Sequence, residues 1–143
     1  GDWAPALSTA TPSRLSERWR VDDGHEAEGG RLGEDLARSH LESIAYTILE
    51  ANYRTRSGEV DLIVEFEGVL IFVEVRTRSG SAFGSPEESL TPRKRSHLVA
   101  AAQEYLQDAD VADAEWRIDL VAVELRPDDR PVRLDVIENA VEA

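Results

Sequence analysis

Two acidic residues, Asp61 and Glu74, lie in stretches of the sequence that are otherwise almost wholly apolar. Asp61 begins the stretch 61–64, and Glu74 falls within 69–76. Consecutive apolar positions are typical of central strands that are covered on both faces of a sheet. Because a carboxylate is rarely buried there unless a cation pairs with it, these two residues are the first candidates for a functional site.

The dipeptide Glu67-Gly68 between the two stretches predicts a β-hairpin with a two-residue turn. In the register that this turn sets, Asp61 lies directly opposite Glu74. Their side chains share one face, with Cβ atoms about 4.5–5.5 Å apart. Two like charges at that separation destabilise a sheet, whereas both would be ligands of a divalent cation placed between them. Carboxylate oxygens are hard ligands, so the expected ion is Mg²⁺ or Mn²⁺.

A network of ion pairs is the alternative explanation for the two acids. Arg76 or Arg117 would then neutralise them without a metal. The same hairpin register places Glu59 opposite Arg76, so we expect a salt bridge between those two residues. Asp119 and Arg117 fall on one face of a later strand and are interpreted as a structural ion pair.

Helices and strands alternate along the chain. Apolar residues at helical spacing predict an amphipathic helix over 31–44, with Glu34 at the border of its apolar stripe. Thr91 and Pro92 suit an N-cap and a first helical position, so a second helix is predicted from there to about Asp108. Strands are predicted at 45–53, in the hairpin at 59–76, and at 116–125 and 132–137, with a loop at 77–90. This order predicts a mixed α/β fold whose central sheet holds a core β-hairpin flanked by helices.

Length and composition bound the class of protein. The 143 residues suggest one folded domain at 30–139, between a flexible acidic tail at 1–29 and a short tail at 140–143. The absence of cysteine excludes disulfides and thiolate zinc sites. Since we find no signal-peptide layout and no apolar run of about 18 residues, we expect a cytoplasmic protein with no membrane partner.

The charge distribution bears on nucleic-acid binding. A net charge of −13 argues against a protein that coats nucleic acid indiscriminately. Residues 76–97, however, hold five basic residues against two acidic ones. A local basic patch on an acidic body would permit contact with phosphate, while a solvated helix end is the alternative interpretation.

The arrangement of these residues resembles a known pattern. An acidic residue on a helix, followed by Asp61 and then by Glu74-x-Arg76 in strands, resembles the PD-(D/E)xK restriction-endonuclease-like superfamily. More closely, the chain resembles the bacterial YraN family, which is described as endonuclease-like and distantly similar to archaeal Holliday-junction resolvases. The resemblance extends from residue 31 to about 137, and the stretches that carry it are 32–37, 52–56, 58–63, 72–78, 83–86, Lys94 and 117–119.

The resemblance implies a restriction-endonuclease-like α/β fold and a metal-dependent endonuclease that hydrolyses phosphodiester bonds in structured or single-stranded DNA. Asp61, Glu74 and the carbonyl of Val75 would hold Mg²⁺ or Mn²⁺, and Glu34 would add a ligand from the helix. The residues expected to contact nucleic acid are Arg54, Arg56, Arg78, Arg93, Lys94 and Arg95. Two alternatives stay open, which are a non-catalytic nucleic-acid-binding module of the same fold and an acidic interaction protein. Resolvase-like proteins often act as homodimers, although no apolar patch in the sequence requires one.

One residue departs from the superfamily pattern. Its last motif residue is Lys, whereas position 76 is Arg. Arginine stays protonated, so Arg76 can stabilise phosphate charge but cannot act as a general base. Lys94, the only lysine in the chain, is the hypothesised source of the missing ammonium group. The alternative is that an arginine-rich chain simply carries Arg in place of Lys.

Overall fold

The computed structural model describes residues 28–79 and 86–142, with side chains from residue 31 onward. The predicted tail at 1–29 falls almost wholly outside these residues, as does the middle of the predicted loop at 77–90. Within the described ranges, no helix is both long enough and apolar enough to cross a membrane.

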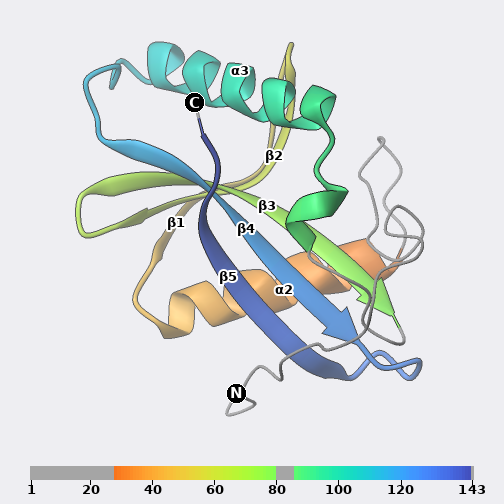
Figure 1. Cartoon of the computed structure of the whole chain (residues 1–143). Helices are drawn as coiled ribbons and strands as arrows, with labels where there is room; N and C mark the ends of the chain where they lie inside the picture. Colours follow the sequence, from red (N-terminus) through yellow and green to blue (C-terminus); the bar gives the residue numbers. More distant parts are fainter. Residues whose placement is uncertain (1–27, 80–85, 143) are drawn as a thin grey trace.

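The described chain forms one mixed sheet with helices packed against it (Figure 1). The elements in chain order are α2 (Glu28–Ser43), β1 (Thr47–Thr55), β2 (Gly58–Phe66), β3 (Val69–Ser79), the short 3₁₀ helix η1 (Pro86–Ser89), α3 (Pro92–Asp108), β4 (Trp116–Leu125) and β5 (Pro131–Val141). The five strands lie in the order β1-β2-β3-β4-β5, with β3 and β4 parallel and every other neighbouring pair antiparallel. The predicted mixed α/β fold with a core hairpin flanked by helices is confirmed.

The hairpin of β2 and β3 forms at its predicted turn. Glu67 and Gly68 have φ angles of 51° and 83°, the left-handed values that a tight two-residue turn needs. Phe66 pairs with Val69, and the predicted register continues to the pair Leu62–Val73. The hairpin therefore places β3 at the centre of the sheet, where β4 adds to its other side.

The two long helices pack on opposite faces of the sheet (Figure 1). Ala37 and Leu41 of α2 belong to one apolar core, together with side chains of β2, β3 and β4. Leu98 of α3 belongs to the other core, with Phe72 of β3 and Ile118 of β4. Because side chains alternate along a strand, Phe72 shares the α3 face of β3 with positions 74, 76 and 78.

The start of α3 is fixed by its cap. Thr91 adopts an extended conformation, and its Oγ1 accepts a hydrogen bond of 3.1 Å from the N–H of Lys94. Pro92 takes the first helical position, where its missing N–H costs nothing. The predicted helix from Thr91 to Asp108 is confirmed, so Lys94 lies in its first turn.

Several predicted boundaries were wrong. The first strand begins at Thr47 rather than residue 45, because Ala45 with φ of 75° belongs to the turn that ends α2. β3 runs on to Ser79, inside the predicted loop, since β4 supplies a partner for its last residues. β5 extends beyond the predicted strand and into the predicted C-terminal tail, because Val141 pairs with Ile118 and is buried.

Candidate functional site

Asp61 and Glu74 occupy the positions that follow the last backbone pair of the hairpin. Both are buried, with 2% and 1% of their surface exposed. The Oδ2 atom of Asp61 accepts a hydrogen bond of 2.8 Å from the N–H of Val75. At this point the side chain of Asp61, rather than the main chain of β2, bonds to β3. The two acids thus lie on neighbouring strands, one position beyond the last register pair, and their direct opposition stays a prediction.

Two cations meet Glu74 at one carboxylate oxygen. The Nη2 atom of Arg76 lies 3.2 Å from its Oε2, and the Nζ atom of Lys94 lies 3.6 Å from the same atom. The Arg76 side chain is fully buried, whereas the Lys94 side chain is 14% exposed. The hypothesis that Lys94 supplies an ammonium group requires this proximity, which the capped first turn of α3 provides.

These contacts change the electrostatic argument for a metal. Arg76 and Lys94 carry together as much positive charge as Asp61 and Glu74 carry negative charge, so repulsion between two acids no longer demands an added cation. The ion-pair alternative is present for Glu74 through Arg76. Arg117 takes no such part, since it pairs with Asp119 at 3.0 Å. A metal site must therefore be argued from the chemistry of its donors.

Among the residues that the structure describes, Glu34 belongs to no three-acid group that could hold a metal ion. It is half-buried on α2, the helix that packs on the face of the sheet opposite α3. Across residues 28–79 and 86–142, no three histidine or acidic side chains form a group that could hold a metal ion. The donors that remain from the predicted set are Asp61 and Glu74, and a part for Glu34 stays a prediction.

Glu59 and Arg54 are paired across β1 and β2. Their side chains lie 3.3 Å apart at positions that face each other in the register. The expected partner of Glu59 was Arg76, but the backbone pairing of β2 with β3 ends before reaching those two residues. Arg76 turns to Glu74 on its own strand instead.

Some residues predicted to contact nucleic acid are exposed, whereas others are bound to groups of the protein itself. Arg54 and Arg56 are 86% and 95% exposed at the end of β1, and Arg93 is exposed at the start of α3. Arg78 is only 1% exposed and pairs with Glu124 of β4 at 3.2 Å. A phosphate would reach Arg78 only if that pair opened, so the surface role expected for it is not supported.

Arg95 is also bound within the protein, through contacts that the sequence did not indicate. Its guanidinium donates three hydrogen bonds of 2.9–3.0 Å to main-chain carbonyls, at Glu87, Leu90 and Ala140. Every residue has a main-chain carbonyl, so the sequence does not show which of them accept a side-chain hydrogen bond. The Arg78–Glu124 pair was equally missed, although the spacing of Glu74, Arg76 and Arg78 places all three on one strand face.

The predicted structural pair of Arg117 and Asp119 is confirmed. Asp119 is 1% exposed, and its Oδ1 atom accepts hydrogen bonds from Arg117 Nε at 3.0 Å and from the N–H of Asn139 at 2.9 Å. Burial raises the pKa of Asp119 above its ordinary 3.8, while both hydrogen bonds act to lower it. The pair anchors the irregular end of β5 to β4.

Comparison with known proteins identifies the family. Residues 33–123 match the model of the Uncharacterised protein family UPF0102. A relative from Solibacter usitatus is 46% identical over 115 residues, covering 79% of this chain and 83% of its own. A relative from Dehalococcoides mccartyi is 40% identical over 114 residues, covering 80% and 93%.

Among solved structures, SfsA from Pyrococcus furiosus in complex with Ca²⁺ aligns over 95% of this chain and 85% of that chain. Its TM-score of 0.37 and sequence identity of 15% are too low to carry an argument. The family match and its relatives are sufficient without it, and the predicted resemblance to YraN proteins is confirmed, since that is the same family. The chain belongs to the UPF0102 family.

Proposed function

We propose that this protein is a metal-dependent endonuclease that hydrolyses phosphodiester bonds in DNA, with structured or single-stranded intermediates as substrates. The observation that carries the proposal is the buried cluster in which Asp61 and Glu74 lie on adjoining strands and Lys94 approaches Glu74 at 3.6 Å. Acids and cations gathered at one buried point are typical of functional sites, although structural ion-pair networks share the feature.

The donors fit a small hard cation. Mg²⁺ in proteins is commonly held by one or two carboxylates together with water, and Asp61 and Glu74 are two such donors. When bound, Mg²⁺ or Mn²⁺ would lower the pKa of a water molecule and offset negative charge on the phosphoryl group. The hydrogen bond from Val75 fixes the Asp61 carboxylate in place, which is the preorganisation that such a site needs.

The cations of the cluster would serve the phosphate. Arg76 and Lys94 both carry positive charge beside Glu74, where they can stabilise a negatively charged phosphoryl group. Lys94 is the most exposed of the four residues, whereas Asp61, Glu74 and Arg76 are at most 2% exposed. A phosphate would therefore approach from the side of Lys94 and the start of α3.

The accessible arginines would hold the nucleic-acid backbone. Arg54 pairs with Glu59 at 3.3 Å, and Arg56 lies 4.0 Å from Glu104. Exposed pairs of this kind contribute about 0–1 kcal/mol, so exchanging an acid for a phosphate costs little. The net charge of −13 predicts weak binding to nucleic acid.

A nucleic-acid-binding module without catalysis is the second candidate. Glu74 already has two cationic neighbours, and Arg76 stands where the superfamily pattern has Lys. Both observations favour a site whose charges are balanced without a metal. The two candidates differ in what Mg²⁺ or Mn²⁺ would do to bound DNA.

The test is incubation with branched and single-stranded DNA in Mg²⁺ or Mn²⁺. We expect cleavage by the wild type, and loss of cleavage with retained binding in Asp61→Asn and Glu74→Gln. Glu65→Gln is the matched control, because Glu65 is an exposed acid on the same strand as Asp61. Binding without cleavage by the wild type would support the second candidate, and no binding at low salt would exclude both.

A further inference from the structure

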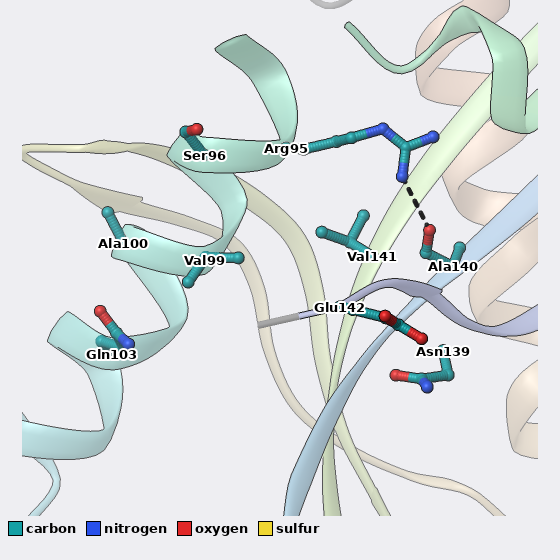
Figure 2. A pocket seen from close by; sticks show the side chains of 9 residues that line it. All are labelled: Arg95, Ser96, Val99, Ala100, Gln103, Asn139, Ala140, Val141 and Glu142. Carbon is teal, nitrogen blue, oxygen red and sulfur yellow. Dashed lines mark hydrogen bonds between the residues drawn. The ribbon is translucent and has the colours of Figure 1, made fainter. Parts of the chain in front are cut away.

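Arg95 joins three parts of the fold through one side chain. It lies in the first turn of α3, and its acceptors lie on η1, on the residue before the α3 cap, and near the end of β5. Figure 2 shows Arg95 extending from α3 to the carbonyl of Ala140. All five guanidinium N–H groups lie in one plane, so three simultaneous acceptors restrict the orientation of the side chain.

The first turn of α3 depends on polar contacts for its position. The buried side chains of this helix are Leu98, Ala101, Ala102 and Leu106, and the earliest of these comes two turns into the helix. Residues 92–97 are exposed or half-buried. Two polar contacts join this turn to the sheet: the Lys94–Glu74 ion pair and the hydrogen bond from Arg95 to Ala140. The other two hydrogen bonds of Arg95 join the turn to η1 and to Leu90.

Small movements of this turn would separate Lys94 from Glu74. Lys94 is four residues before Leu98, so both project toward the sheet. Side chains extend about 5–6 Å from a helix axis, so a rotation of about 20° moves a side-chain tip by about 2 Å. Their present separation is 3.6 Å, and such a shift would break the ion pair.

We propose that Arg95 is a positioning residue that holds Lys94 against Glu74. The assignment takes its catalytic meaning from the proposed function, in which Lys94 stabilises phosphate charge. The contact between Lys94 and Glu74 can be tested whether or not the protein cleaves DNA. Arg95 then acts on the site from the neighbouring helix position, without touching substrate.

The experiment measures the energetic coupling between Lys94 and Glu74 in different backgrounds. A double-mutant cycle of Lys94→Met and Glu74→Gln on the unfolding equilibrium gives their coupling factor. The cycle is repeated with Arg95→Met. Arg95 lines a groove of about 680 Å³ between α3 and the end of β5 (Figure 2), and methionine keeps a long side chain there without the guanidinium. Arg93→Met is the matched control, since Arg93 is exposed in the same helical turn.

We expect a coupling factor of about tenfold in the wild type and in the Arg93→Met control. In the Arg95→Met protein it should fall to about twofold or less. A residue that only stabilises the fold would lower the stability of every variant and leave the factor unchanged, and that result would overturn the proposal. If Arg95→Met does not fold, Arg95→Lys carries the same comparison, because an ammonium group cannot reproduce the planar fork. Absence of DNA cleavage by the wild type would remove the proposed function but would leave this coupling measurement intact.

Discussion

Gly33 allows α2 to approach the sheet directly behind the candidate site. A Cβ atom at this position would collide with Oγ1 of Thr77 on β3, and it would also lie 3.0 Å from Cβ and 3.1 Å from Cγ2 of the same residue. Thr77 is 3% exposed and lies between Arg76 and Arg78 in the strand. Gly33→Ala should therefore destabilise the protein, although alanine ordinarily stabilises a helix.

The expected magnitude follows from two opposing effects. Replacing glycine by alanine inside a helix gains about 0.8–1.0 kcal/mol. Overpacking of a buried contact costs about 1–3 kcal/mol, and rotation of a β-branched side chain only brings another of its atoms toward the intruding methyl group. Since Thr77 cannot move away as a whole, the cost falls in the upper half of that range, about 2–3 kcal/mol, and we expect a net loss of about 1–2 kcal/mol in the free energy of unfolding.

Urea denaturation of Gly33→Ala, Thr77→Ala and the double variant tests this reasoning. Thr77→Ala removes the two atoms at the γ positions, so the double variant should be more stable than the sum of the single changes predicts, by about 1–2 kcal/mol. Ser39→Ala, at an exposed position of α2, is the control and should change stability by less than about 0.5 kcal/mol. A Gly33→Ala protein as stable as the wild type, with no coupling to Thr77, would refute the close approach.

Three further predictions concern the cap, the buried acid and the exposed arginines. Thr91→Ala should lower the free energy of unfolding by about 1 kcal/mol in urea titrations, because the N–H of Lys94 loses its acceptor. The pKa of Asp119 is raised by burial, so the folded state retains a proton that the unfolded chain releases; stability should fall as pH rises from 3.8 through the folded pKa, and Asp119→Asn should remove this slope in pH-dependent melts. If DNA binds, Arg54→Ala and Arg56→Ala should each reduce the salt slope of its affinity by about 0.7–0.9, and an unchanged slope would exclude contact with phosphate.

Local signals predicted the central elements of the fold correctly. The hairpin register depends on two turn residues, Glu67 and Gly68, and the start of α3 depends on Thr91 and Pro92. Each signal operates within a few residues of the feature it predicts. The end of β5 could not be predicted this way, because its pairing with β4 passes through an irregular register and through Asn139 at a φ of 54°.

The candidate site was predictable only in part, for a similar reason. Asp61 and Glu74 each adjoin the last register pair of one hairpin, so their placement on neighbouring strands follows from a single turn. Lys94 reaches Glu74 from the helix that connects β3 to β4, and its placement depends on the packing of that helix. Arg78 is buried beside Glu124 of β4, which is 46 residues further along the chain. Contacts between distant elements therefore set which basic residues are accessible.

The cost of the buried charges favours a chemical role for them. Transferring an ion pair from water into a protein interior costs several kcal/mol per ion, and apolar residues of similar volume often stabilise a fold as well or better. Strand β3 buries Phe72 and Val73 immediately before Glu74, so this part of the sheet accommodates buried apolar side chains. Packing alone thus gives no reason for acids at positions 61 and 74 or for a cation at 76. A site that handles charged phosphate does require fixed charges shielded from water, because charge interactions are stronger there than in solvent.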